Sequence, residues 1–396
     1  MCARTLLAAM ISMVLAAHAS ADNSDVTVSQ AGDLNVAQVT QVSNGGQSPP
    51  NSASVDQEGT HNNVDVSQEN YGGRNTVSAS QTGQGNGSTL SQYGVEQTLS
   101  TAQQGSNNSL SGAQIGRGNT AQLSQVGDSN HINAFQYSED GTHALEVAQS
   151  GVSNSTFVSQ YDASSVASIY QEGDHNGINL LQSVRANNYS GEQSGSDNFA
   201  LVNQAGGASA HTSQTGTANT IDLQQTAWPF GATTSIMQTG TANDATVVQT
   251  DAGRYSGGSV SLTQDGQSNV ADVTATGAWS NLEFAQTGTA NQLNVVQSGR
   301  NVSTVGSSTG DGNQVDVAQD GDDHSLDLVQ NGNDNMIVAT QDGYWGEGDI
   351  GSVSQTGSFN FASLTQNPSG VEGTLSNTAV ISQTGMGNSA VVTQGQ

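Results

Sequence analysis

The sequence has a single cysteine, Cys2, no lysine, four prolines and only six basic residues among 396. Without a second cysteine the chain forms no internal disulfide, so its stability must come from hydrogen bonding and packing. The formal net charge of -28 disfavours binding to nucleic acid or to anionic lipid headgroups. This surplus of acidic residues could attract Ca²⁺ or simply keep the chain soluble, and no acidic loop has the spacing of a calcium-binding loop.

Long apolar runs are absent except near the N-terminus. Residues 1–21 contain Arg4, an apolar run from Leu6 to Ala17 and a small-x-small ending at Ala19-Ser20-Ala21. This pattern predicts a secretory signal peptide that is cleaved after Ala21, so the mature protein is expected to be secreted and extracellular. No other stretch approaches the roughly 20 apolar residues of a membrane-spanning helix. The product is therefore predicted to be released or displayed, not membrane-embedded.

What the chain does have is an eleven-residue repeat, Gln-x-Gly-x-x-Asn-x-apolar-x-apolar-x-Gln, which runs from Gln30 to Gln394. The closing Gln of each copy opens the next. Thirty-two positions mark the repeat, and 23 of the 31 intervals between them are eleven residues long. Ala275 and Ser308 replace Gln without a change of spacing. A period this regular indicates a repeat array and not a series of globular domains.

The apolar residues of the repeat keep a fixed parity. In the copy that starts at Gln57, the residues Asn62, Val64, Val66 and Gln68 are two apart, so they would share one face of a strand of about five or six residues. The residues between them would face water. The Gln-x-Gly-x-x segment supplies glycine and polar residues for a bend. Disorder, which the hydrophobic content of 33% and the 48 glycines would otherwise favour, is the second interpretation.

Strands and bends in alternation predict an all-β fold, a β-solenoid with two short parallel-stacked strands per rung of about 22 residues and about 15 rungs. The expected parts are a signal peptide at 1–21, a short N-terminal segment at 22–29 and the repeat solenoid at 30–396. Irregular intervals are expected to be insertions at surface bends.

Stacked rungs would place identical amides above one another, so each buried Asn or Gln could donate to the carbonyl of its neighbour in a ladder. The structural ladder is expected to include Gln57, Gly59, Asn62, Gln68, Gln114, Gly116, Asn119, Gln125, Gln171, Gly173, Asn176, Gln182, Gln214, Gly216, Asn219, Gln286, Gly288, Asn291, Gln297, Gln383, Gly385, Asn388 and Gln394.

Two segments carry a family resemblance. The segment from Asn108 to Gln125 reads Asn-x5-Gln-x-Gly-x2-Asn-x-Ala-x3-Gln, and the segment from Ser165 to Gln182 keeps this spacing, with Ser at its start and Ile178 in place of Ala. The pattern resembles the curlin repeat of bacterial curli amyloid subunits. The resemblance covers nearly everything after residue 30. The chain departs from a familiar curlin in having many more repeats and little or no targeting segment before them.

The resemblance implies an extracellular functional amyloid, exported unfolded through an outer-membrane secretion pore and polymerised into fibres for surface adhesion and biofilm matrix. It implies as partners further copies of the chain, a nucleator subunit and the secretion pore. The last repeat, Gln383 to Gln394, lacks basic residues, which favours a major-type subunit. Terminal rungs expose unpaired backbone groups, and we expect too few residues outside the repeat to form a cap over them. We therefore expect the terminal rung of one subunit to template the next subunit end to end.

Two other classes of function were compared with this one. A monomeric secreted solenoid could be an adhesin or an ion-binding surface protein, although the tandem Gly-Gly-x-Gly-x-Asp of calcium-binding repeats is absent. Three Thr-Gly-Thr-Ala-Asn copies, at 215–219, 239–243 and 287–291, are too few for an ice-binding lattice. An enzyme is not expected, because the arginines are dispersed and the histidines lack metal-ligand spacing, so no catalytic residue, cofactor or metal is predicted. The densest ionisable cluster, Asp320 to His324, is interpreted as a solvated bend.

Overall fold

The computed structural model describes residues 24–43, 50–70, 73–139, 141–162, 164–227, 231–250, 257–343, 348–367 and 376–395. The expected signal peptide lies outside the described residues. The regular structure of the described residues is β-strand, and they include no helix long and apolar enough to cross a membrane. The chain falls into two compact units, Met1–His175 and Asn176–Gln396. Each is a parallel β-solenoid, which confirms the predicted fold class.

The first unit contains strands β1 to β13. Their bounds are β1 Asp25–Asp33, β2 Val36–Ser43, β3 Ser52–Thr60, β4 Asn63–Asn70, β5 Thr76–Gln84, β6 Gly87–Val95, β7 Thr98–Ser106, β8 Ser109–Arg117, β9 Thr120–Asp128, β10 His131–Ser138, β11 Ala144–Val152, β12 Ser155–Asp162 and β13 Val166–Asp174.

The second unit contains strands β14 to β32. Their bounds are β14 Gly177–Ser183, β15 Asn188–Ser196, β16 Phe199–Ala205, β17 Ser209–Thr217, β18 Thr220–Thr226, β19 Thr233–Thr241, β20 Asp244–Thr250, β21 Ser259–Gln267, β22 Val270–Thr276, β23 Asn281–Thr289, β24 Gln292–Arg300, β25 Ser303–Thr309, β26 Gln314–Asp322, β27 Ser325–Asn331, β28 Met336–Gly343, β29 Ile350–Ser358, β30 Phe361–Asn367, β31 Thr378–Met386 and β32 Ser389–Gly395.

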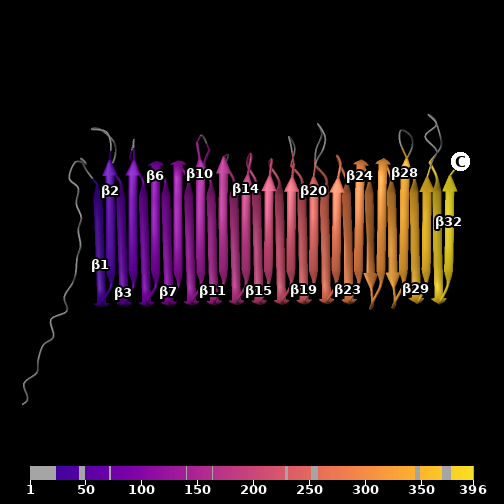
Figure 1. Ribbon diagram of the computed structural model, residues 1–396, viewed down its shortest axis with the longest axis horizontal. Coiled ribbons are helices and arrows are strands. Elements are labelled where there is room, and N and C mark those ends of the chain that lie inside the picture. The colour runs from indigo at the N-terminus through magenta and orange to yellow at the C-terminus, as the bar shows by residue number, and fades with distance from the viewer. Residues whose placement is uncertain are drawn as a thin grey trace, which may run out of the picture. The chain divides into compact units, whose positions relative to one another are not determined.

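Within each unit the odd-numbered strands form one parallel sheet and the even-numbered strands form another. Figure 1 shows the odd-numbered arrows pointing down and the even-numbered arrows pointing up, so the chain alternates between the sheets at every bend. Corresponding residues pair in register: Gln57 of β3 lies opposite Gln81 of β5, and Gln68 of β4 lies opposite Gln92 of β6. The described residues contain 16 odd-numbered and 16 even-numbered strands, which is close to the expected 15 rungs of two strands each.

The strands are longer than the sequence predicts. They contain seven to nine residues, as in β14 and β3, because the Gln-x-Gly segment continues the strand and does not form the bend. Gly59 still pairs with Gly83 in the parallel ladder. The chain turns just afterwards, at His61 and Asn62, where His61 has a φ of 58°. The bend is therefore only about two residues long, and the glycine serves a different purpose that is described below.

The two kinds of bend differ in their spacing. Bends from an odd to an even strand, which we call the constant edge, always join Gln positions that are eleven residues apart. Bends from an even to an odd strand, which we call the variable edge, contain every irregular interval: 41–57, 68–81, 136–149, 204–214, 225–238, 249–264, 341–355 and 366–383. All length variation of the repeat is therefore confined to one edge.

The interior between the two sheets is narrow. It is filled mainly by Ala, Val, Leu and Ile, and Tyr189 and Phe284 are the largest fully buried side chains. A Cβ added to Gly191 would come 2.4 Å from the Tyr189 hydroxyl, and one added to Gly306 would come 2.6 Å from Cε2 of Phe284. Each ring thus uses the space left by a neighbouring glycine, as close packing requires.

Candidate functional site: amide ladders and the two edges

Two columns of glutamine run through the interior, one on each sheet. In the first unit, Nε2 of Gln57 donates to Oε1 of Gln81 at 2.9 Å, and Nε2 of Gln68 donates to Oε1 of Gln92 at 2.8 Å. The second hydrogen of the amide reaches a backbone carbonyl, for example Gln57 Nε2 to Val36 O at 3.0 Å. All four glutamines are at most 1% exposed. Stacking thus satisfies amides whose burial would otherwise cost about 1–3 kcal/mol each.

The even-strand column is interrupted once in the second unit. Ala275 keeps the register between Gln249 and Gln297 but has no amide to offer either neighbour. As a result Nε2 of Gln249 and Oε1 of Gln297 are buried without a hydrogen-bond partner. Ser308, in the odd-strand column, donates its hydroxyl to Gln330 Oε1 at 2.8 Å. The two replacements that look alike in the sequence therefore differ in what they do to the ladder.

A column of asparagine lines the constant edge. Asn86 is representative: its backbone N–H and its Nδ2 both donate to Oδ1 of Asn62, each at 3.1 Å. Its Nδ2 also donates to the carbonyl of Gly105 on the following rung, at 2.9 Å. The same arrangement recurs at Asn219 and Asn291 in the second unit. Each asparagine therefore ties three successive rungs together.

The glycine of the constant edge allows the rungs to stack closely. Gly105 has a φ of 119°, and a Cβ added there would lie 2.1 Å from the carbonyl oxygen of Gly127 on the next rung. Equivalent contacts of 2.0 Å occur at Gly59 and Gly216. Only glycine combines this backbone conformation with this close approach. The repeat needs Gly here for rung spacing more than for turning.

The expected ladder residues occupy three kinds of position. On the constant edge lie Gly59, Asn62, Gly173, Asn176, Gly216, Asn219, Gly288, Asn291, Gly385 and Asn388, whereas Gly116 and Asn119 lie on the variable edge. The odd strands carry Gln57, Gln125, Gln171, Gln214, Gln286 and Gln383, and the even strands carry Gln68, Gln114, Gln182, Gln297 and Gln394.

The variable edge has a mixed column, of which the expected ladder included only Asn119. Asn51, Asn75, Gln97 and Asn119 precede odd strands in the first unit, and Ala208, Ala232, Gly258 and Val302 take that place in parts of the second. Two buried histidines, His143 and His324, and the fully buried Asp349 belong to the same column. His324 is 2% exposed, so the interpretation of Asp320 to His324 as a solvated bend is wrong for its last residue. Each column residue lies six residues before an odd-strand Gln position, as His143 does before Gln149 and Asp349 before Gln355, so the repeat spacing could have identified these positions.

The last rung lacks the cover that interior rungs have. Ala362 and Leu364 of β30 are fully buried, whereas Ala390 and Val392, which take the same positions on β32, are partly exposed. Nε2 of Gln394 donates to Thr378 O at 3.0 Å and has no following Gln among the described residues. At the first rung Val26 is 42% exposed, while its partner Ala53 on the next odd strand is 2% exposed. Among the described residues, the first and the last rung therefore each form the end of a sheet, and the amide columns stop there.

The outer faces of the sheets carry polar side chains together with exposed apolar ones such as Phe157 and Tyr170, and acidic residues gather at one place on them. On β18 to β22 in the second unit, burial raises the pKa of Asp244, and the neighbouring carboxylates of Asp222 and Asp272 raise it further. Among the described residues no group of three or more His, Cys, Asp or Glu side chains is arranged to hold a metal ion. These carboxylates therefore form a crowded acidic surface without the geometry of a cation site.

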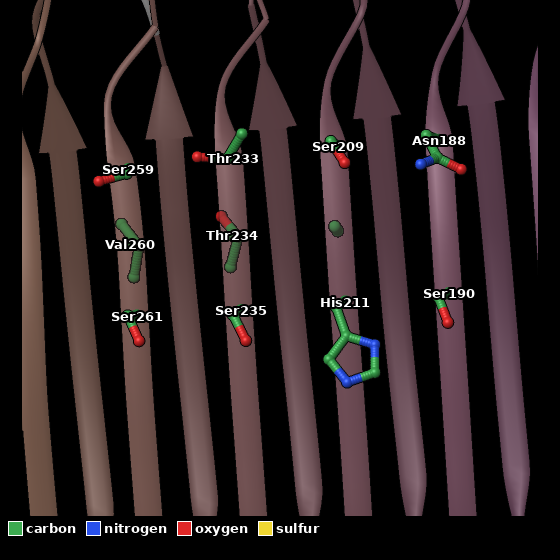
Figure 2. Close-up of a pocket in the computed structure, with 11 residues that line it drawn as sticks. Asn188, Ser190, Ser209, His211, Thr233, Thr234, Ser235, Ser259, Val260 and Ser261 are labelled. Carbon is green, nitrogen blue, oxygen red and sulfur yellow. The ribbon is translucent and has the colours of Figure 1, made fainter.

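A shallow groove of about 320 Å³ lies on the outer face of β15, β17, β19 and β21. Figure 2 shows Asn188, Ser209, Thr233 and Ser259 in one row and Ser190, His211, Ser235 and Ser261 in the next. The rows follow the strand register. The groove offers hydroxyl, amide and imidazole groups in a flat array that suits hydrogen bonding.

The fold and these columns define a parallel β-solenoid held together by buried amide ladders. No family model matches the chain, and no curated protein is similar to it. Its resemblance to the curlin repeat is therefore a resemblance of sequence pattern alone.

Proposed function

We propose that the chain is a structural subunit of an extracellular curli-like amyloid fibre that supports surface adhesion and the biofilm matrix. Subunits join end to end, because the last rung of one copy templates the first rung of the next. The observation that carries the proposal is the direction of the glutamine columns. Where the ladder is intact, each Gln donates to the Gln of the following rung, so the first rung offers the acceptors Gln30 and Gln41 and the last rung offers the donors Gln383 and Gln394.

Stacking a second copy on the last rung would continue every column in the same direction. The interface joins two different surfaces, one from each end of the subunit. Such a head-to-tail contact gives an open filament unless the rotation between subunits closes a ring. It would also bury the partly exposed side chains of Ala390 and Val392 and pair the backbone groups of β31 and β32. A nucleator and a secretion pore are the further partners that the resemblance implies, and the function requires no catalytic residue or cofactor.

A seeded elongation assay on the secreted chain, residues 22–396, tests the proposal. Val392 points toward the interior of the last rung, so V392K would place a charge against the incoming subunit and should slow elongation at least tenfold. Thr393 points outward on the same strand, so T393K serves as the matched control and should elongate like the original chain. The fibres should give a reflection at about 4.7–4.8 Å along their axis.

A chain that stays monomeric at all concentrations would overturn the proposal and favour the alternative, a monomeric solenoid adhesin or ion-binding surface protein. Equal elongation by V392K and T393K would exclude templating at the last rung. Binding of the soluble monomer to surfaces or to Ca²⁺ would then separate the two forms of the alternative.

A further inference from the structure

Two buried histidines replace asparagine in the column of the variable edge, one in each unit. His143 directly precedes β11 and is 1% exposed, and His324 directly precedes β27 and is 2% exposed. At the equivalent place Asn51 uses its Oδ1 to accept the backbone N–H of Asn75, at 3.2 Å. The imidazole rings therefore have to supply an acceptor for the next rung.

The hydrogen bonds of His143 define its protonation state. Its Nδ1 accepts the backbone N–H of Ser165 at 3.1 Å, and its Nε2 lies 2.9 Å from the carbonyl oxygen of Tyr137. A backbone N–H can only donate and a carbonyl can only accept, so the ring is neutral with its hydrogen on Nε2. Protonation would place a second N–H on Nδ1, pointing at the N–H of Ser165. The cationic form is thus incompatible with this joint between rungs.

The ring of His324 makes the same two contacts. Its Nδ1 accepts the backbone N–H of Asp349 at 3.1 Å, and its Nε2 lies 3.2 Å from the carbonyl oxygen of Asp320. The difference lies in the residue on the next rung. Oδ2 of Asp349 is 3.9 Å from the same Nδ1 and has no hydrogen-bond partner, while Oδ1 accepts from Asn377. A proton on His324 would therefore find a buried carboxylate beside it.

The charged groups near His143 do little to stabilise a protonated imidazole ring. Burial lowers the pKa of His143, and the contacts with Tyr137, Asp162 and Ser165 only partly oppose this effect. Glu139, on the same bend, accepts a hydrogen bond from the Tyr137 hydroxyl. On the rung before it, Arg117 is paired with Glu96 at 3.1 Å.

Around His324 the surroundings are more acidic. Asp320 and Asp322 lie at the end of β26, Asp323 lies on the bend beside His324, and Asp342 of β28 lies opposite Asp320 in the strand register. Arg300, on the preceding even strand, is the nearby basic group and is engaged by Asp322 at 3.3 Å.

We propose that His143 makes the variable edge of the first unit an acid-sensitive joint, and that Asp349 protects the corresponding joint at His324. Because the folded state disfavours the proton on His143, the stability of its joint is fully present above the ordinary histidine value of 6.5 and is lost as the pH falls below it. The opening exposes the edge between β11 and β13 while the constant edge keeps its asparagine column. The inference is independent of fibre formation.

Hydrogen exchange of the secreted chain between pH 7.5 and pH 4.5, with residue resolution and correction for intrinsic rates, tests the proposal. Protection of the Ser165 amide should fall by about tenfold for each pH unit below 6.5, since opening takes up one proton. Protection of the Asp349 amide should change much less. A constant protection at Ser165, or an equal loss at both amides, would overturn the proposal.

Reciprocal variants separate this mechanism from general acid unfolding. H143N restores the amide that the column uses elsewhere and should abolish the pH dependence at Ser165, and S165D should weaken it. D349S should make the second joint acid-sensitive, while H324N should leave the Asp349 amide insensitive to pH. An unchanged acid response of Ser165 in H143N would show that another group is responsible.

Discussion

The constant and variable edges of the solenoid are built from the same repeat but obey different constraints. The constant edge keeps an eleven-residue spacing, a positive-φ glycine and an asparagine at every rung. The variable edge carries all the insertions, and its column changes from Asn to Gln, His, Ser, Ala, Gly, Val or Asp. Within each unit the asparagines of the constant edge are therefore hydrogen-bonded from rung to rung, whereas the variable edge accommodates changes of sequence.

The difference has a physical cause in the number of rungs that each side chain connects. Asn219 on the constant edge bonds to Asn198 on the preceding rung and to the carbonyl of Gly240 on the following rung. On the variable edge Ala232 has no polar side chain, but its backbone still joins the rungs, because the Ser209 N–H donates to the Ala232 carbonyl at 2.9 Å. Where the column residue of the variable edge is apolar, backbone pairing alone maintains the edge, so the side chains at such rungs can be exchanged.

The largest difference between the two edges is expected when the same insertion is placed at each of them. Two residues inserted after Ser129, on the constant edge, would separate Asn130 from Asn108 and from the Gly151 carbonyl. Several buried polar groups would lose partners at about 1–3 kcal/mol each, enough to open neighbouring rungs. The same insertion after Gly141, on the variable edge, should be tolerated. Local hydrogen exchange of β9 to β12 compares the two, and equal disruption would contradict the account.

A single methyl group at the constant edge should have the next largest effect. G105A would bring a Cβ to 2.1 Å from the Gly127 carbonyl at a φ of 119° and should destabilise the first unit by about 3 kcal/mol or more. Gly87 is the matched control, because a Cβ added there meets nothing within 4 Å. Urea unfolding of G105A and G87A measures the difference. A G105A protein as stable as G87A would mean that the rungs are not so closely stacked.

Repair of the interrupted column should stabilise the second unit. A275Q would supply an acceptor for Gln249 Nε2 and a donor for Gln297 Oε1, which are both unpartnered and buried. The expected gain is about 1–3 kcal/mol, provided that the new side chain adopts the ladder conformation. S308Q should gain less, since Ser308 already bonds to Gln330. Urea midpoints of the two variants give the comparison, and a larger gain from S308Q would contradict it.

The smallest effect is expected for an outward-facing side chain, Asp244, which lies at the start of β20 beside the constant edge. The pKa of Asp244 is raised in the folded state, so its ionised form destabilises the fold at neutral pH and stability increases as the pH falls through that raised value. D244N should remove this pH dependence and stabilise by less than about 1 kcal/mol at pH 7, because the group is largely exposed to solvent. A pH series of urea unfolding curves measures both quantities, and destabilisation by D244N would exclude carboxylate crowding.

The sequence predicts the architecture well because one pattern carries several constraints at once. The parity of Asn62, Val64, Val66 and Gln68 identifies the interior face, and the regular spacing identifies the stacking. The sequence also contains the difference between the edges, because every irregular interval follows a Gln of an even strand. This regularity can be recognised only after successive repeats have been assigned to two sheets.

Other features depend on contacts between rungs and could not be predicted from one repeat. The glycine was expected to form the bend, but Gly59 lies within β3 and its role is to admit the carbonyl of Gly83. Likewise, nothing in the spacing shows that Ala275 leaves an amide atom of each of its neighbours in the column without a partner while Ser308 still donates to the following Gln330. The role of His143 follows from its place beside Ser165, 22 residues away in the sequence.

The most direct test is the exchange of backbone amides on the two edges of the second unit. The N–H groups of Asn219, Asn243 and Asn269 each donate to the Oδ1 of the preceding asparagine, at 3.1 Å. In the column of the variable edge, Ala232 is preceded by Ala208, and Gly258 is preceded by Ala232. Neither alanine has a side-chain oxygen that could accept the next N–H. The account predicts that the three asparagine amides exchange at least tenfold more slowly than those of Ala232 and Gly258. Equal rates at the two edges would contradict it.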